Sequence, residues 1–195
     1  METGSLNADE RKFLLNLARD TITLELNGTD NETFDLGAVP APLQSPGAAF
    51  VTLHTRSGAL RGCIGSLQAR RSLVEDVCNN ALAAAFEDPR FPSLTARELP
   101  DIVIEISVLS APQPLAYVGS DDLLQKLRPR IDGVVLESGW HRATFLPQVW
   151  DQLPTPVEFL RNLCYKAGLP GDAWRSGELK ISTYQVEEFS ENEVV

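Results

Sequence analysis

An arginine and a cysteine, two residue types that can take part in chemistry, lie between glycines in the stretch ALRGCIGSLQ, residues 59–68. A guanidinium binds carboxylates and phosphates through paired hydrogen bonds, and a cysteine sulfur can act as a nucleophile. We therefore take Arg61 as a candidate anion-binding residue and Cys63 as a candidate catalytic residue. Glycine weakens a strand interior and often marks a close approach to the backbone, so Gly62 and Gly65 could clear space beside these side chains.

The alternation of apolar residues predicts which way these side chains point. The runs AAFVTLHT and ALRGCIGS form a predicted hairpin that turns at Ser57-Gly58, a register that pairs Thr52 with Cys63 and His54 with Arg61. One predicted face is polar and holds Thr52, His54, Arg61 and Cys63. The other is apolar and holds Val51, Leu53, Leu60 and Ile64. A slip by one residue would mix charged and apolar side chains on both faces, so we reject it.

His54 is the second candidate catalytic residue, because a histidine can activate a nearby thiol. Across the hairpin it is only a diagonal neighbour of Cys63, about 7–8 Å away by backbone position, so a Cys–His pair needs side-chain reorientation. Structural interpretations stay open as well. Arg61 could pair with a carboxylate from a loop or from the other half of the chain, Cys63 could be a packed small side chain, and His54 could cover a sheet edge.

Arg90 is a further candidate for ligand binding. It lies in the stretch EDPRFPSLT, residues 87–95, directly after a predicted helix. It could join Arg61 at an anion site, or it could form a local ion pair with Asp88, and we favour the local pair.

Composition excludes several classes of function. The net charge of -10 and the pI near 4.7 oppose binding to nucleic acids and to anionic membranes. No apolar run approaches a membrane span of about 18–20 residues, and the acidic start lacks the basic region of a signal peptide, so we expect a cytoplasmic protein. Two histidines and three cysteines without a CxxC spacing predict no metal site, no disulfide framework and no cofactor. Cys78 and Cys164 occupy apolar positions of predicted helices, which indicates structural roles.

The predicted elements form a repeating order. A capped N-terminal helix and a Gly- and Pro-rich wrap cover residues 6–47, and Phe34, Leu36 and Val39 give that wrap something to bury. A hairpin, a helix with a Ser72–Glu75 capping box and a strand at 101–109 follow. A second hairpin, a helix and one strand over 178–189 repeat this order. We expect an α+β fold of two hairpin–helix–strand subdomains, roughly 48–110 and 130–190, packed together with a cleft between the halves.

Three stretches resemble the AMMECR domain family, and within it the bacterial branch called AmmeMemoRadiSam system protein A. They are FVTLHTRSGALRGCIGSL, AAAFEDPRFPSLTARELPDIVIEISVLS and RATFLPQVWDQLPTPVEFLRNLCYKAGLP. The resemblance extends from about Leu6 to Glu191 and implies one domain over residues 1–195, with two repeated subdomains and a cleft beside RGCIG. It implies that the functional segment is Arg61, Gly62, Cys63, Ile64 and Gly65.

The family name also implies two partners, a Memo-like protein and a radical S-adenosylmethionine enzyme. The resemblance carries no reaction with it. We therefore expect component A of a three-protein system, which binds a small, anionic molecule or a peptide end beside Arg61 and is an enzyme if Cys63 is a nucleophile. The alternative is a non-catalytic adaptor that binds the Memo-like protein or the radical S-adenosylmethionine enzyme.

Overall fold

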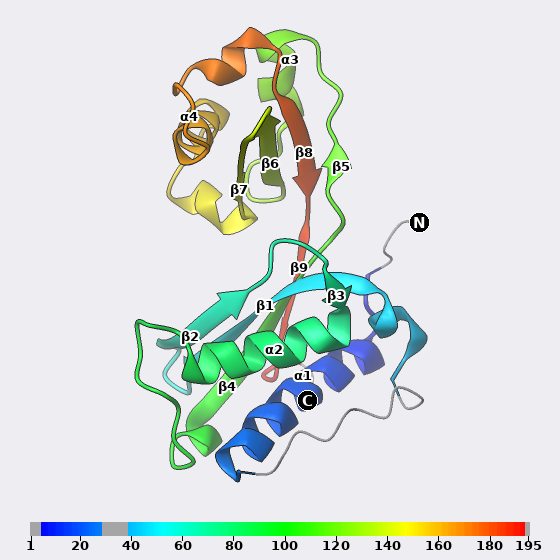
Figure 1. Ribbon diagram of the computed structural model, residues 1–195, viewed down its shortest axis with the longest axis vertical. Coiled ribbons are helices and arrows are strands. Elements are labelled where there is room, and N and C mark those ends of the chain that lie inside the picture. Colours follow the sequence, from blue (N-terminus) through cyan, green and yellow to red (C-terminus); the bar gives the residue numbers. More distant parts are fainter. Residues whose placement is uncertain (1–4, 29–38, 194–195) are drawn as a thin grey trace. The chain divides into compact units, whose positions relative to one another are not determined.

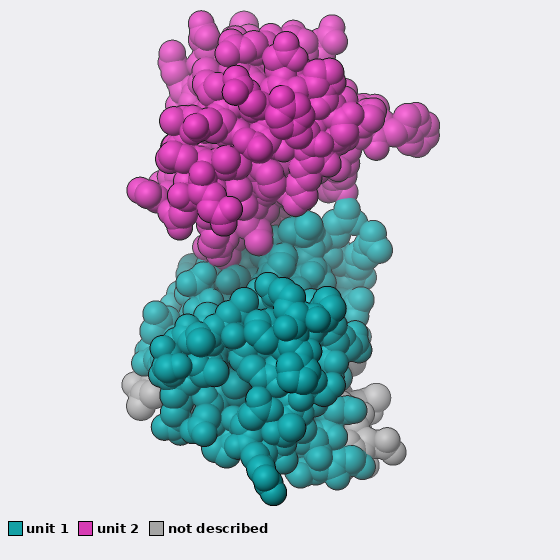
Figure 2. All heavy atoms as spheres, turned by 90° about the vertical axis from the view of Figure 1, so that its left-hand side faces the viewer, with its two compact units in different colours: residues 1–109, 187–195 teal, residues 110–186 magenta. Residues whose placement is uncertain are grey.

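The structure is a computed structural model that describes residues 5–28 and 39–193 (Figure 1). The chain forms two compact units (Figure 2). Unit 1 comprises residues 1–109 and 187–195, and unit 2 comprises residues 110–186. The fold is α+β, with helices and an antiparallel sheet in each unit.

Unit 1 is built on a sheet with the strand order β2-β1-β4-β9, and a short strand, β3, pairs with the beginning of β1. Its elements are α1 (Ala8–Leu26), β1 (Pro46–Thr55), β2 (Leu60–Gly65), β3 (Arg71–Ser72), α2 (Leu73–Phe86), β4 (Ile102–Leu109) and β9 (Val186–Ser190). Two short 3-10 helices, η2 (Ala41–Gln44) and η3 (Leu99–Asp101), precede β1 and β4. β1 pairs antiparallel with both β2 and β4, so it lies between these two strands in the sheet.

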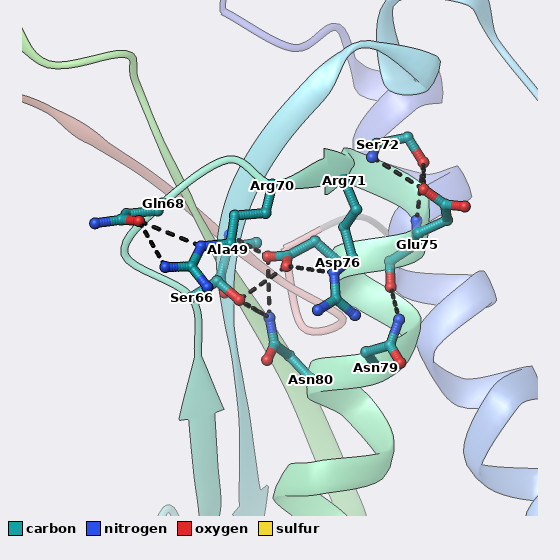
Figure 3. A network of polar contacts seen from close by, with 10 residues as sticks. All are labelled: Ala49, Ser66, Gln68, Arg70, Arg71, Ser72, Glu75, Asp76, Asn79 and Asn80. Carbon is teal, nitrogen blue, oxygen red and sulfur yellow. Dashed lines mark hydrogen bonds and ion pairs between the residues drawn. The ribbon is translucent and has the colours of Figure 1, made fainter.

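Both helices of unit 1 begin at side-chain caps. The side chain of Asn7 accepts a hydrogen bond from the N–H of Glu10, and the N–H of Asn7 donates one to the Glu10 carboxylate. Ser72 and Glu75 form the same pair of hydrogen bonds at the start of α2 (Figure 3). These capping boxes satisfy backbone N–H groups that have no partner inside the helix. The Ser72–Glu75 prediction is confirmed. α2 ends at Phe86, shortly before Asp88-Pro89, because the residue before a proline disfavours the helical conformation.

The core of unit 1 lies between its sheet and its two helices. Every second residue of the central strands points toward α1 and α2: Ala49, Val51 and Leu53 on β1, and Ile102, Ile104 and Ile106 on β4. Burying each of the larger of these side chains stabilises the fold by about 1.5–3 kcal/mol. The intervening residues, among them Thr52, His54, Cys63 and Glu105, lie on the side of the sheet away from the two helices. We call this side the outer face.

The register of the first hairpin is confirmed for most of its length. Cys63 faces Thr52, and its neighbour Ile64 faces Val51 and packs on the core, so Cys63 and Ile64 are on opposite sides of the sheet. The predicted pairing of His54 with Arg61 is wrong, because a bulge sets His54 opposite Leu60 instead.

The bulge explains both departures from the expected faces. It places two residues opposite one, and Arg61 is the extra residue, which frees its side chain to turn toward the loop after α2. Leu60, which we expected in the apolar set, is 40% exposed.

Unit 2 contains a sheet with the strand order β5-β8-β6-β7. Its elements are β5 (Gln113–Pro114), α3 (Gly119–Lys126), β6 (Gly133–Ser138), β7 (His141–Phe145), η4 (Pro147–Asp151), α4 (Pro156–Lys166), η5 (Ala173–Ser176) and β8 (Lys180–Tyr184). The core of this unit includes Trp150, whose ring stacks on Phe159 with centroids 3.8 Å apart. Thr155 caps α4, and Gly168 follows its end with a positive φ of 76°.

The hairpin–helix–strand order appears in both units. In each sheet the first strand of the hairpin, β1 or β6, lies between its hairpin partner and the strand that follows the helix, β4 or β8. The single strand expected over 178–189 is wrong, because the chain forms two strands there, β8 in the sheet of unit 2 and β9 in the sheet of unit 1.

The limits of the units therefore differ from the expected subdomains, and α3 was not anticipated. In the wrap, Val39 is buried in the core of unit 1, while Phe34 and Leu36 lie outside the described residues.

Candidate functional site

The backbone of Cys63 is held from outside the sheet. β2 is an edge strand, and the N–H and C=O of Cys63 bond to groups beyond the strand. The N–H donates to Asp88 Oδ2 at 2.9 Å, and Arg90 Nη2 donates to the carbonyl oxygen of Cys63 at 3.2 Å. Because both groups are occupied, this part of the edge cannot pair with another strand. The loop after α2 therefore fixes the position of one residue of β2, and that residue is the cysteine.

Asp88 and Arg90, the two residues that hold the backbone of Cys63, also form a bidentate salt bridge with each other. Arg90 donates from Nε and Nη2 to the two carboxylate oxygens of Asp88, at 2.9 and 2.6 Å. The Asp88 side chain is buried, and the hydrogen bonds from Arg90 hold the pKa of its carboxyl far below the ordinary value. The local ion pair that we favoured for Arg90 is thus present, and its role in ligand binding stays a prediction.

Arg61 is buried and paired with a carboxylate of the same loop. Its Nε donates to Glu98 Oε1 at 2.9 Å and its Nη2 donates to the carbonyl oxygen of Pro92, also at 2.9 Å. The hydrogen bond from Arg61 lowers the pKa of Glu98 to about 2. Arg61 Nη1 is buried and has no hydrogen-bond partner among residues 5–28 and 39–193. The charge of Arg61 is therefore balanced within the chain, as in the structural interpretation, and binding of an anion by Arg61 stays a prediction.

The two glycines around the cysteine allow close packing within the chain. A side chain on Gly62 would overlap the carbonyl oxygen of Ala84, in the last turn of α2. A side chain on Gly65 would overlap the ring of Phe50 on β1. Both positions therefore require glycine for internal contacts. Ile64, which lies between the two glycines in the sequence, packs against the core of unit 1. Contact of Gly62, Ile64 or Gly65 with a ligand stays a prediction.

Cys63 is half-buried, and its side chain lies on the outer face. Thr52 Oγ1, directly opposite on β1, donates a hydrogen bond to Cys63 Sγ at 3.3 Å. His54 turns to the other side of β1, where its Nε2 lies 3.8 Å from Glu105 Oε1 on β4. Within the described part of the chain, no hydrogen bond joins His54 to Cys63.

Glu105 completes a row of three side chains across the sheet. It faces Thr52 across β1 and β4, just as Cys63 faces Thr52 across β1 and β2. Burial, and secondly the negative charge of Glu188, raise the pKa of Glu105. We did not anticipate Glu105, although it is the single charged residue of a strand in which only Ser107 is also polar. The alternation of IVIEISVL assigns Glu105 to the outer face.

A second polar network, not anticipated either, holds the residue that follows β2. Asp76 of α2 is buried and accepts hydrogen bonds from Ser66 Oγ at 2.8 Å, from the N–H of Ala49 at 2.9 Å and from Asn80 Nδ2 at 3.0 Å (Figure 3). Arg71 Nε approaches the same carboxylate at 3.7 Å. α2 thus contacts the strand at Gly62, through its last turn, and again just past its end at Ser66. The sequence signal for this network was a carboxylate on the apolar face of a helix.

The two other cysteines lie in the cores. Cys78 and Cys164 are buried, and burial raises the pKa of each thiol, that of Cys78 to about 11. Within residues 5–28 and 39–193, no group of three or more His, Cys, Asp or Glu side chains could hold a metal ion. No helix in the same ranges combines the length and the apolar character of a membrane span.

Fold and site together define a two-unit α+β protein with one cysteine fixed at a sheet edge. A model of the AMMECR1 family matches residues 15–189. A protein of Methanothermobacter thermautotrophicus is 36% identical over 197 residues, which cover 98% of this chain and 100% of that protein. Protein MJ0810 of Methanocaldococcus jannaschii is 34% identical over 194 residues, which cover 96% of this chain and 93% of that protein. The chain belongs to the AMMECR1 family.

A solved structure agrees with this assignment. The crystal structure of the uncharacterized protein PH0010 from Pyrococcus horikoshii is similar with a TM-score of 0.77 and 33% sequence identity. The similarity covers 95% of this chain and 93% of that one.

Proposed function

We propose that this chain is the A component of an AmmeMemoRadiSam-type three-protein system, and that it binds a small molecule or a peptide end beside Cys63. One observation carries the ligand-binding part: separate groups hold Cys63 at its N–H, its C=O and its sulfur. A reacting or contacting atom must be held within a fraction of an ångström by its surroundings, and this arrangement supplies such support. The family membership supports the assignment to the system.

Cys63 would act as a nucleophile or as a close contact of the ligand. A nucleophilic thiol needs a group that takes its proton, and Thr52 donates to the sulfur instead of accepting from it. In an enzyme the proton acceptor would therefore be the ligand, a partner protein or a reoriented His54. Arg61, which we expected to bind an anion, and Arg90, the weaker candidate, each have a carboxylate partner. An anionic ligand would therefore compete with Glu98 or bind Arg61 at Nη1.

The adaptor remains the second candidate function. The orientation of His54 toward Glu105 favours it, because a Cys–His pair is not assembled. An adaptor would use the same fixed strand as a rigid docking element for the Memo-like protein or for the radical S-adenosylmethionine enzyme.

Ligand binding is tested by thermal shift on the full chain. Carboxylates, phosphate, amines and short peptides are screened against the unmodified protein, Cys63→Ala and the control Cys78→Ala. A ligand present at 100 times its Kd stabilises the fold by about 2.7 kcal/mol, a Tm increase of several degrees. We expect that increase in the unmodified protein and in Cys78→Ala, each relative to its own Tm, and not in Cys63→Ala. Equal increases in all three proteins would contradict a site beside Cys63.

The adaptor is tested by mixing the chain with a Memo-like protein and a radical S-adenosylmethionine enzyme from one organism and measuring complex formation by size-exclusion chromatography. A stable complex that Cys63→Ala forms equally well, together with no ligand in the thermal-shift screen, would favour the adaptor. A complex that requires the thiol, or none at all, would not.

A further inference from the structure

The two most exposed large apolar residues of the described chain belong to unit 2. Trp140 is fully exposed and Val118 is 88% exposed, whereas the other two tryptophans, Trp150 and Trp174, are buried in the core. Trp140 lies in the turn between β6 and β7, where the backbone requires only the preceding Gly139, whose φ is 57°. A small polar residue would suit the turn equally well, so the fold does not explain a tryptophan at this position.

Trp140 and Val118 lie at the same end of the unit 2 sheet. β6 ends at the turn that holds Trp140, and near this turn Glu137 of β6 pairs with Lys180, the first residue of β8. On the other side of β8 the chain runs toward the same end: the N–H of Leu115 donates to a carbonyl oxygen of β8, and Val118 follows three residues later. Strand spacing puts the two backbones roughly 10–15 Å apart. We call this end of the sheet the turn end.

The turn that presents Trp140 is held in place. It contains only two residues, because Ser138 pairs with His141 directly across it. His141 Nδ1 donates to the carbonyl oxygen of Ala167, at the end of α4, at 2.8 Å. An aromatic side chain on a fixed backbone loses little conformational freedom when it binds, and tryptophan is enriched among the residues that dominate protein–protein affinity. Trp140 is therefore suited to act as an anchor in an interface.

The charges decide which occupant suits this surface. The strands at the turn end bring together two cations and two carboxylates: Arg142 is paired with Glu137, and Lys180 follows Glu178 by two residues. Surfaces that bind membranes surround their apolar side chains with an excess of Lys and Arg, which these four residues do not supply. The net charge of -10 repels anionic lipid and equally a second copy of the chain, whereas it attracts a protein of opposite charge.

We infer that the turn end of unit 2 is a docking surface for a second protein, which carries a net positive charge and an apolar pocket that receives the Trp140 indole. This goes beyond the proposed function, which places the ligand at Cys63 in unit 1. It rests on the proposed function for the choice of probe proteins only.

The test measures binding of the full chain to a Memo-like protein and to a radical S-adenosylmethionine enzyme from the same organism, by isothermal titration calorimetry. We expect one of them to bind, and Trp140→Ser to weaken that binding roughly 10- to 100-fold. The matched control is Ile131→Ala, at an exposed apolar residue before the opposite end of β6, which should change the affinity by less than about 2-fold. Because Trp140 is fully exposed, Trp140→Ser should leave the Tm unchanged, so weaker binding would not reflect unfolding.

Hydroxyl-radical labelling, resolved by peptide mass spectrometry, tests the same surface without a variant. Trp140 should be oxidised faster than the buried Trp150 and Trp174 in the free chain, and the bound partner should reduce its oxidation several-fold. Raising the salt from about 0.05 M to about 0.5 M should slow association, because attraction between opposite net charges is screened.

Each contrary result has its own meaning. A complex that Trp140→Ser forms equally well would overturn the inference and leave the three-protein system intact. No complex with either protein would also overturn it, while the thermal-shift screen would still decide whether a ligand binds beside Cys63. Protection of Trp140 by anionic vesicles, or by higher concentrations of the chain alone, would identify a membrane or a second copy as the occupant instead. An association rate that does not fall with salt would overturn the positive charge of the partner.

Discussion

The two units share an order of elements, but they differ in net charge and in the contacts made to the edge strand of their hairpins. Unit 1 contains 19 acidic and 9 basic residues, and unit 2 contains 8 of each, so the whole net charge of -10 belongs to unit 1. In unit 1 a bulge interrupts the β1–β2 pairing, and two ion pairs lie beside β2. In unit 2 the β6–β7 register runs without a shift, and Lys166 Nζ donates to the carbonyl oxygen of Thr144 on the edge strand.

The comparison shows that a hairpin can pair regularly without a bulge and without buried ion pairs beside it. β6 and β7 pair without a bulge, and their one ion pair, Arg142 with Glu137, is about half exposed on both sides. β2 is irregular at Arg61 and is fixed by buried polar groups at Cys63. Such groups are costly to bury unless they are paired, and beside β2 both Arg61 and Asp88 have a partner of opposite charge.

The largest expected effect separates the glycines of the two hairpins. Gly62→Ala should lower the free energy of unfolding by about 3 kcal/mol, because the added carbon overlaps the backbone of Ala84, which cannot move without shifting α2. In unit 2, Gly139→Ala meets open space and should cost about 1 kcal/mol, from its positive φ of 57° alone. Urea unfolding of both variants measures the difference. Equal losses would mean that the contact between β2 and α2 is not tight.

The arginines of the two hairpins should differ next. Arg61→Met leaves Glu98 with its hydrogen bonds from Thr95 but without its cationic partner. It should cost about 1–3 kcal/mol, below the full value for a buried pair because the Glu98 side chain is 40% exposed. Arg142→Met removes a surface pair and should change stability by less than about 0.5 kcal/mol. Thermal unfolding of the two variants checks this. If Arg61→Met does not change the stability, the structural interpretation of Arg61 is wrong and an anion-binding role is favoured.

A smaller effect appears in the dependence of stability on pH. The folded-state pKa of Glu98 is lowered to about 2 from its ordinary 4.5, so its ionised form is favoured in the folded protein. That stabilisation is complete above about pH 4.5 and is lost as the pH falls toward about 2. Glu98→Gln should therefore flatten the stability curve of unit 1 in this window. Parallel curves for the unmodified protein and Glu98→Gln would contradict the Arg61–Glu98 pair.

Local patterns predicted most of unit 1. The alternation of apolar residues assigned Cys63 and Ile64 to opposite faces, and the caps and the Asp88-Pro89 pair located α2, because each depends on residues a few positions apart. The bulge at Arg61 could not be predicted in this way, since it depends on Glu98, 37 residues along the chain. The division of 178–189 between two sheets was missed for a related reason: its apolar pattern does not distinguish one long strand from two.

The site itself was predicted in part. The opposition of Thr52 and Cys63 followed from the hairpin register, and the Asp88–Arg90 pair from their closeness in sequence. The hydrogen bonds of Asp88 and Arg90 to the backbone of Cys63, and the row of Cys63, Thr52 and Glu105, could not be predicted. They depend on the order of strands in the sheet, which the sequence pattern of one hairpin does not contain.

The central claim is that Cys63 is the positioned and reachable thiol of this protein. Alkylation of the native full chain with iodoacetamide, resolved for each cysteine by peptide mass spectrometry, tests it most directly. Cys63 is half-buried, while Cys78 and Cys164 are buried and their pKa values are raised by burial, so Cys63 should be modified first. Earlier modification of Cys78 or Cys164 in the folded protein would contradict the claim.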